Sequence, residues 1–434
     1  MLIARATLLD GAGVDIRVAE QITAVEQTLA PLPGEQVYDA AGRTVIPGLH
    51  DHHVHLLSAA AALRSARVGP AEVRNRAELA RVLATAHVGA DGWVRAVGYH
   101  EAAAGRLDRD VLDEVSPPVP VRVQHRSGVL WTLNSAGLAR VGMVDHPDGR
   151  LRSADRSWSD TLQRNDTGLA EVSARLSGFG VTGVTDATPD LEVGDIVRLL
   201  ESHRTRGVRQ RIHCLAPGKR ILHDLDLDLD ELTAWICERH ADGAPVAVHC
   251  VTAAQLVITL SALRATGTHP KDRIEHASVV PDESLAALAE SGVTVVTQPN
   301  FVAERGDQYL ADVPAAEHHE LWRVASLVQA GVPIALSTDM PFGAGDPWAT
   351  VRAAVHRVTG NGTVLGADER IAAPEALSMF FGTGEDPLRR RAVAPGQPGD
   401  LAVLAPPADE AVETLASDMV AATVIAGEVV FERG

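Results

Sequence analysis

Short apolar runs separated by turn residues dominate both ends of the 434-residue chain. The runs LIARATLLD, VDIRVAE, ITAVEQ and TVIPG lie near the start, and DLAVLAPP, MVAATVIAG and EVVFERG lie near the end. Such runs are typical of short β-strands, which need partners to be stable. We therefore expect residues 1–49 and 386–434 to pair in one small β-sandwich.

Between the two ends, β-type runs alternate with helical segments. The candidate strands are VIPGLHDHH, GVTGVTDA, RQRIHCLA, KRILH, PVAVHC, RIEHAS, VTVVTQP and PIALSTD. Strands that alternate with crossover helices in this number predict an α/β fold, a (β/α)8 TIM-like barrel, over residues 50–385. Two more candidate strands, WVRAVGY and VPVRVQHR, predict an insertion after barrel strand 1, at about residues 60–170.

Composition and charge narrow the class of protein. Apolar residues make up 46% of the chain, as in globular proteins. The formal net charge of −18 argues against binding to nucleic acid through phosphates. No apolar run approaches the roughly 18 residues of a membrane span, and the first residues lack a signal-peptide pattern. Three cysteines without a CxxC pair fit a reducing compartment. We expect a cytoplasmic protein that binds a small-molecule substrate.

Polar residues end several of the apolar strands. His53 and His55 are two positions apart, so they share one face of a strand. His249, His276 and Asp339 each stand at the end of a later strand. Function in such barrels gathers at the C-terminal strand ends, where an unpartnered buried polar group would be costly. Because neutral imidazole and carboxylate are metal ligands, the pattern predicts a metal centre.

Lys219 is a further candidate, since it is one of only two lysines among 39 cationic residues. An ammonium cannot ligate a cation, but reaction with carbon dioxide gives an anionic carbamate whose two oxygens can bridge two metals. The segment RIHCLAPGK leaves no room for a crossover helix between strands three and four, because parallel strands need about a dozen connecting residues. A mononuclear site without Lys219 therefore stays open.

Taken together, VIPGLHDHHVH, the lysine on strand four, PVAVHC, RIEH and ALSTD resemble the amidohydrolase superfamily. The stretches VRVQHRSGVLWTLNSAGLARVGM, RIEHASVV, VTVVTQPNFV and STDMPFGAGDPW are similar to its YtcJ-like branch. This branch, also called the amidohydrolase 3 family, includes N-substituted formamide deformylases. The resemblance spans nearly the whole chain, and it implies a homodimer only at the level of the family.

The resemblance implies a binuclear centre bridged by a carboxylated Lys219 and a hydroxide. The ligands are His53, His55 and Asp339 for the more buried metal, and His249 and His276 for the second. We expect two zinc ions, with manganese, iron or cobalt as alternatives, because N/O ligand sets accept several metals. Asp339 would take a proton from water and return it to the leaving nitrogen.

These features predict hydrolysis of a carbon–nitrogen bond in an amide, formamide, carbamate, urea or cyclic amide. Two alternatives stay open: a mononuclear deaminase or ester/lactone hydrolase on the same fold, and a catalytically decayed ligand-binding protein. Relatives usually carry a histidine where this chain has Val129, which weakens the inference about substrate. The predicted substrate-binding residues are His100, His125, Arg126, Trp131, Asn134, Gln298, Asn300 and Phe342.

Overall fold

The computed structural model describes residues 1–152, 158, 168–189 and 191–434. The chain divides into two compact units. Residues 1–55 and 170–434 form what we call the main unit, and residues 56–169 form the inserted unit. Residues 153–157 and 159–167 of the predicted insertion lie outside the described ranges. The predicted boundaries of the β-sandwich and barrel domains stay predictions.

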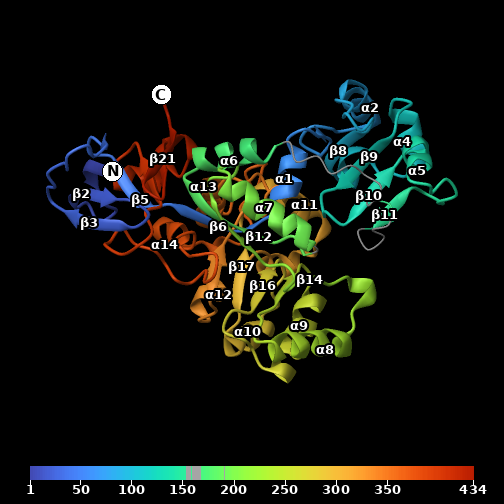
Figure 1. Ribbon diagram of the computed structural model, residues 1–434. Helices are drawn as coiled ribbons and strands as arrows, with labels where there is room; N and C mark the ends of the chain where they lie inside the picture. The colour runs from blue at the N-terminus through green and yellow to red at the C-terminus, as the bar shows by residue number, and fades with distance from the viewer. Residues whose placement is uncertain (153–157, 159–167, 190) are drawn as a thin grey trace. The chain divides into compact units, whose positions relative to one another are not determined.

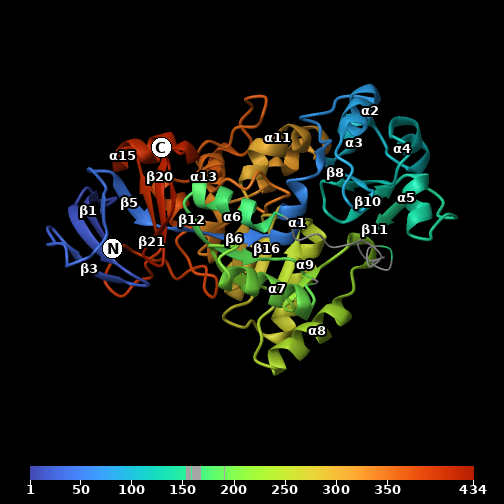
Figure 2. The ribbon, with the colours of Figure 1, turned by 45° about the horizontal axis from the view of Figure 1, so that its top comes forward.

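Both ends of the chain contribute to one eight-stranded sheet of the main unit, with order β21-β20-β19-β5-β1-β2-β3 and β4 beside β1. Figure 1 and Figure 2 show the blue N-terminal strands beside the red C-terminal ones. The ends join where β5 pairs antiparallel with β19. The strands are β1 (Leu2–Thr7), β2 (Gly13–Val18), β3 (Ile22–Glu26), β4 (Val37–Asp39), β5 (Thr44–Pro47), β19 (Leu401–Leu404), β20 (Val420–Ile425) and β21 (Glu428–Glu432).

Each of the predicted barrel strands is present, and every ladder between them is parallel. They form two sheets, ordered β13-β12-β6 and β14-β15-β16-β17-β18. A parallel bridge between Val54 and Met340 connects the first sheet to the chain just after β18. The strands are β6 (Leu49–Val54), β12 (Val181–Asp186), β13 (Arg211–Cys214), β14 (Lys219–Ile221), β15 (Ala247–Cys250), β16 (Arg273–His276), β17 (Thr294–Thr297) and β18 (Ile334–Leu336).

The arrangement is a TIM-barrel-like α/β fold, but among the residues that the structure describes the strand ladders do not close into the ring of the predicted (β/α)8 barrel. No ladder joins β13 to β14 in the described part of the chain. Only residues 215–218 connect these two strands, far fewer than the roughly dozen that a parallel crossover needs. Pro217 in this connection also lacks a backbone N–H to donate to a neighbouring strand. The short spacing seen in the sequence therefore corresponds to a gap between the two sheets.

Helices follow most of the parallel strands, and local sequence sets their ends. In α9, Thr252 and Gln255 form a capping box two residues after β15 ends, and Gly292 ends α10 in the left-handed conformation. These signals start and stop the helices close to the strand ends. The main-unit helices are α6 (Leu169–Gly178), α7 (Val193–Arg204), α8 (Leu229–Ala241), α9 (Ala253–Thr266), α10 (Ser284–Ser291), α11 (Asn300–Asp312), α12 (Ala325–Gln329), α13 (Pro347–His356), α14 (Ala373–Ser378) and α15 (Ala408–Thr414).

The inserted unit contains a five-stranded mixed sheet with order β11-β10-β9-β8-β7. The two predicted strands of the insertion are present as β8 and β9, which pair in parallel. The elements are α1 (Leu56–Ala62), β7 (Ala66–Arg67), α2 (Arg76–Thr85), β8 (Val94–Tyr99), α3 (Glu101–Ala104), α4 (Arg109–Val115), β9 (Val121–His125), β10 (Leu130–Leu133), α5 (Ser135–Arg140) and β11 (Arg150–Arg152). A core of its own packs on this sheet, centred on Leu79, Leu83, Val94 and Leu112.

Replacing Trp348 with alanine should destabilise the main unit strongly. Its side chain is fully buried in α13, and its indole Nε1 donates to the Phe179 carbonyl at 2.9 Å. Removing a buried aromatic leaves a cavity and costs about 3–5 kcal/mol. Urea unfolding followed by circular dichroism measures the loss. The control Val193→Ala, at a side chain that is 78% exposed, should change stability by less than about 0.5 kcal/mol. Equal midpoints for the two variants would contradict this packing.

Candidate metal centre

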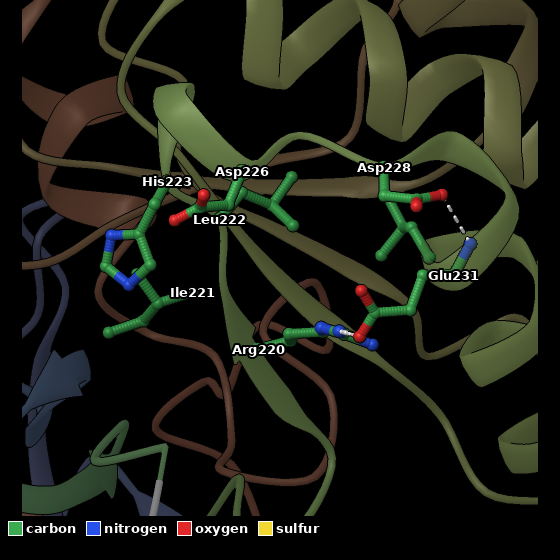
Figure 3. Close-up of a pocket in the computed structure, with 8 residues that line it drawn as sticks. Arg220, Ile221, Leu222, His223, Asp226, Asp228 and Glu231 are labelled. Carbon is green, nitrogen blue, oxygen red and sulfur yellow. Dashed lines mark hydrogen bonds and ion pairs between the residues drawn. The ribbon is translucent and has the colours of Figure 1, made fainter. Parts of the chain in front are cut away.

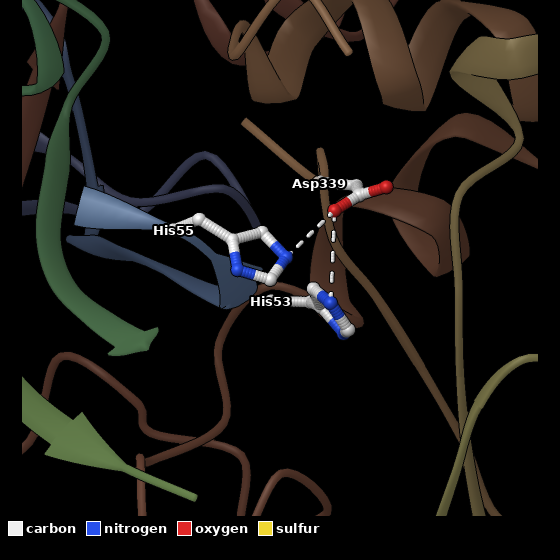
Figure 4. A group of neighbouring side chains, drawn as sticks. All are labelled: His53, His55 and Asp339. Carbon is white, nitrogen blue, oxygen red and sulfur yellow. Dashed lines mark ion pairs between the residues drawn. The ribbon is translucent and has the colours of Figure 1, made fainter. Parts of the chain in front are cut away.

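Three of the predicted ligands lie together where β6 meets the segment after β18. The Asp339 Oδ1 atom lies 3.6 Å from His53 Nε2 and 3.4 Å from His55 Nε2, and all three side chains are buried (Figure 4). The backbone holds this register, because the Asp339 amide donates to the His53 carbonyl at 3.0 Å. Among the described residues, Asp339 Oδ1 accepts no hydrogen bond. A buried carboxylate oxygen without a donor fits a site built to receive a cation.

The other three predicted ligands complete the group. Lys219 Nζ lies 3.0 Å from His53 Nε2, and the ring centroid of His276 lies 4.7 Å from that of His53. The rings of His249 and His276 lie 4.5 Å apart. The C-terminal ends of parallel strands meet at one edge, which explains why residues so distant in sequence gather here. The structure brings all six side chains together, and their role as ligands stays a prediction.

Three of the histidines use one ring nitrogen for orientation. His53 Nδ1 contacts the Glu275 carboxylate, His55 Nδ1 lies 3.0 Å from Thr188 Oγ1, and His276 Nδ1 lies 2.8 Å from Gln298 Oε1. A metal-binding histidine typically fixes its tautomer through such a partner, so that the other nitrogen keeps a lone pair for the ion. For His53 and His55 that other atom, Nε2, is the one that faces Asp339. The donor set therefore fits a divalent metal ion.

Glu275 and Thr188 also contact the centre, although neither was among the site residues predicted from the sequence. Glu275 is fully buried in β16 and also binds the Arg273 guanidinium at 2.7 and 3.1 Å. One signal was present, because Arg273 and Glu275 place two charges on one face of an otherwise apolar strand. Thr188 gave no comparable signal, since its contact with His55 joins residues that are 133 positions apart.

Burial controls the protonation of the centre. Desolvation lowers the pKa of His53 and His276 well below the usual value, and it lowers the pKa of His249 to about 3, with the charge of Lys219 as a further cause. The three rings are therefore neutral at pH 7, the form that binds metal. Burial also lowers the pKa of Lys219 to about 8. Its amine is thus far easier to deprotonate than that of an exposed lysine.

Three of the predicted substrate-binding residues lie beside the centre. The Oε1 atom of Gln298 already binds His276 Nδ1. The Phe342 ring lies 5.2 Å from the His55 ring in an edge-on arrangement. Asn300 is buried, and its Nδ2 donates to the Thr338 carbonyl at 3.2 Å. Contacts to the protein account for the polar groups of Gln298 and for Asn300 Nδ2, so their predicted contact with substrate stays a prediction.

The remaining predicted substrate-binding residues lie in the inserted unit, and their role in substrate binding also stays a prediction. Asn134 caps α5 through its Oδ1 and holds the Val119 carbonyl through its Nδ2 at 2.8 Å. The Trp131 ring lies under the guanidinium carbons of Arg95 and Arg122 at 5.3 and 5.6 Å. These contacts give both residues a structural task within the unit. The others in this group are His100, His125 and Arg126.

A second group of possible metal ligands occurs in the inserted unit, formed by His100, Glu101 and His125. The Nδ1 atoms of His100 and His125 accept backbone N–H groups of Ala102 and Ser127, each at 3.1 Å. In a neutral imidazole the proton then lies on Nε2, and His125 Nε2 donates it to Glu101 at 3.1 Å. Hydrogen bonds within the unit therefore already use ring nitrogens of both histidines. This makes the group a weaker candidate for binding a metal than the centre formed by His53, His55 and Asp339.

A polar depression lies at the end of β14, next to the start of α8 (Figure 3). Arg220 pairs with Glu231 there, and Asp228 caps α8 by accepting the Glu231 amide at 2.9 Å. The acidic tract at residues 225–231 thus leads into α8, where Asp228 serves as the helix cap and Glu231 as an ion-pair partner. His223, two residues after the end of β14, borders the depression.

Comparison with known proteins shows which protein family this chain belongs to. Residues 36–431 match the amidohydrolase family, and the chain belongs to this family. It is 26% identical over 473 aligned positions to N-substituted formamide deformylase of Arthrobacter pascens, with 87% of this chain and 84% of that protein covered.

Solved structures share the fold. An uncharacterized metal-dependent hydrolase of Pyrococcus horikoshii OT3 superposes with a TM-score of 0.73 at 19% identity, over 93% of this chain and 96% of its own. N-isopropylammelide isopropylaminohydrolase of Burkholderia multivorans superposes with a TM-score of 0.53 at 15% identity, over 99% and 98% of the two chains. The prediction of an amidohydrolase, an enzyme that acts on carbon–nitrogen bonds other than peptide bonds, is confirmed.

Among the described residues, no helix is both long and apolar enough to cross a membrane.

Replacing Glu275 with glutamine should weaken metal binding. The carboxylate fixes the His53 tautomer, and loss of such a partner typically costs about 10–100-fold in metal affinity. Titration of the metal-free protein with zinc against a chelator of known affinity measures the change. Glu290→Gln, at an exposed position of α10, is the matched control and should bind zinc like the unaltered protein. If both variants bound zinc equally, Glu275 would have no part in orienting His53.

Proposed function

We propose that the protein hydrolyses a carbon–nitrogen bond in a small amide, formamide, carbamate, urea or cyclic amide. One observation carries the proposal: four histidines, a lysine and a carboxylate converge at strand ends, and within the described ranges the buried Asp339 Oδ1 atom of this group accepts no hydrogen bond. The likeness to a formamide deformylase supports N-substituted formamides as the first substrates to try.

The donor set suits two divalent ions, with zinc the first choice and manganese, iron or cobalt as alternatives. The residues that would hold them are His53, His55, His249, His276, Asp339 and carboxylated Lys219. When bound, such ions supply Lewis acidity that polarises a carbonyl oxygen and lowers the pKa of water. The surrounding residues position these ligands, exclude bulk water and carry the proton.

Lys219 would act as a carbamate. Burial lowers the pKa of its amine to about 8, so roughly a tenth of the side chains are neutral at pH 7. The neutral nitrogen attacks carbon dioxide, forms a C–N bond and loses one proton, which leaves an anion with two oxygens. The position of Nζ, 3.0 Å from the His53 nitrogen that faces Asp339, supports a ligand role for these oxygens.

Asp339 would carry the proton. Its Oδ1 lies 3.6 Å from His53 Nε2 and 3.4 Å from His55 Nε2, so a water held next to these atoms would be within reach of the carboxylate. The carboxylate accepts a proton from water as the new C–O bond forms, and then donates it to the nitrogen as the C–N bond breaks. Leaving as a neutral amine removes the cost of expelling an amide anion.

A mononuclear deaminase or hydrolase is the second candidate, and one observation favours it. His53, His55 and Asp339 alone place three donor atoms within 4.8 Å of one another, which is enough to hold one ion. In that case Lys219 would stay an unmodified amine. Metal content and the state of Lys219 separate the two candidates.

The purified protein should contain about two metal ions per chain and the added mass of one carbon dioxide. Native mass spectrometry and elemental analysis measure both. The adduct should re-form on the metal-free protein with added bicarbonate and zinc. At a constant concentration of dissolved carbon dioxide, its rate should rise about tenfold per pH unit up to about pH 8 and then level off, because the neutral amine of Lys219 saturates there.

Lys219→Arg is the control for the adduct and should carry none, while Lys271 remains as an exposed lysine in the same chain. One ion per chain without an adduct in the unaltered protein would favour the mononuclear candidate. Absence of any tightly bound metal would contradict both.

Asp339→Asn should keep metal but lose turnover by about 10²–10⁴-fold, because an amide cannot accept the water proton. Hydrolysis of N-alkylformamides and N-alkylureas, with metal content measured on the same samples, gives the comparison. Asp312→Asn, at an exposed position near the end of α11, should hydrolyse them like the unaltered protein. Full turnover by metal-loaded Asp339→Asn would disprove the proton shuttle.

A further inference from the structure

Asp339 has a backbone conformation that non-glycine residues rarely adopt. Its φ is +57°, in the left-handed region. Such a conformation persists only where the surrounding structure fixes it firmly. The metal-facing position of the carboxylate depends on this backbone turn, so the contacts that hold the turn matter for the proposed chemistry.

Two amides inside the loop fix the Asp339 carbonyl. The N–H groups of Phe342 and Gly343 donate to this oxygen at 2.7 and 2.9 Å. Gly343 also packs very tightly, because a Cβ there would lie 2.2 Å from the Thr338 carbonyl oxygen and 2.5 Å from Asn300 Nδ2. The loop therefore packs closely against α11, and its shape depends on the side chains at the start of this helix.

The first turns of α11 bind both flanks of this loop. Asn300 Nδ2 donates to the Thr338 carbonyl at 3.2 Å, one residue before Asp339. The Glu304 Oε1 atom accepts the Ala344 amide at 3.1 Å, and Arg305 donates to the Phe342 carbonyl at 2.6 Å. Because the flanks are tied to one rigid helix, the turn at Asp339 has little freedom to relax.

Asn300 and Glu304 form one connected pair. Asn300 Nδ2 donates to Glu304 Oε1 at 3.1 Å in addition to the Thr338 carbonyl. A side-chain amide has two N–H donors, and both are used in these contacts. Glu304 is exposed, whereas Asn300 is only 2% exposed. Asn300 thus connects α11 to the Thr338 carbonyl, in the backbone just before Asp339.

We infer that Asn300 and Glu304 are positioning residues for Asp339. This inference rests on the proposed function, in which Asp339 binds metal and carries the proton. It also gives Asn300 a different task from the substrate contact expected from the sequence, because the amide hydrogens of its side chain already serve the loop. The pair acts on the reaction through the backbone turn of Asp339 and not by contact with the reacting atoms.

Glu304→Leu and Glu304→Gln test the inference on the full-length protein. Leucine keeps the side-chain bulk but cannot accept the Ala344 amide, whereas glutamine keeps an acceptor oxygen. Hydrogen–deuterium exchange of peptides covering residues 338–346 reports on the turn without any metal. The visible absorption spectrum of the cobalt(II)-loaded protein reports on the surroundings of the ion, and a thermal melt reports on global stability.

With Glu304→Leu we expect exchange of the 338–346 amides to become about tenfold faster or more, together with an altered cobalt(II) spectrum. Glu304→Gln should restore both, and both variants should melt within a few degrees of the unaltered protein. The control Glu290→Leu, at an exposed glutamate of α10, should change neither readout.

Unchanged exchange and spectrum in Glu304→Leu would overturn the inference. So would faster exchange at Ala344 alone, with Phe342, Gly343 and the spectrum unaffected, because the turn at Asp339 would then be independent of the pair. If the unaltered protein bound no cobalt(II), the proposed function would fail. Exchange at Phe342 and Gly343 would still decide whether Glu304 holds the turn.

Discussion

A buried carboxylate oxygen that receives no hydrogen bond from the part of the chain that the structure describes is the constraint around which the centre is arranged. Asp339 Oδ1 lies 3.6 Å from His53 Nε2 and 3.4 Å from His55 Nε2, and a buried anion in such a place is costly without a cation. The neighbouring groups share this need, since burial lowers the pKa of His249 and Lys219 and so removes positive charge from the site. A bound cation would satisfy all of these groups at once.

The rest of the main unit serves to keep these donors in place. The partners of His53, His55 and His276 come from different strands and loops, so each ring is fixed from outside its own strand. Glu275 is held in turn by Arg273, whose guanidinium also binds the His52 carbonyl at 2.7 Å. Arg273 therefore connects the backbone next to His53 with the carboxylate that orients the His53 ring. These hydrogen bonds involve charged groups, which makes them stronger than hydrogen bonds between neutral groups.

Much of this arrangement could be predicted from local pattern. An apolar run that ends in a polar residue predicts both a buried strand and a functional strand end, and this logic located His249, His276 and Asp339. Contacts across the fold were beyond such reasoning. The partner of His55 depends on strand register, and the turn at Asp339 depends on a helix that packs against it. The gap between β13 and β14 was visible as a short connection, but its effect on the sheet needed three-dimensional pairing.

The pairing of β5 with β19 has a consequence for how the chain folds during synthesis. Thr44 binds the Pro406 carbonyl, a contact between residues 362 positions apart. The edge of β5 therefore has no native partner until nearly the whole polypeptide has left the ribosome. Contacts of such long range slow folding, and an unpaired apolar edge invites association with other chains in the meantime. Efficient production of this enzyme thus depends on protecting its first strands until its last ones arrive.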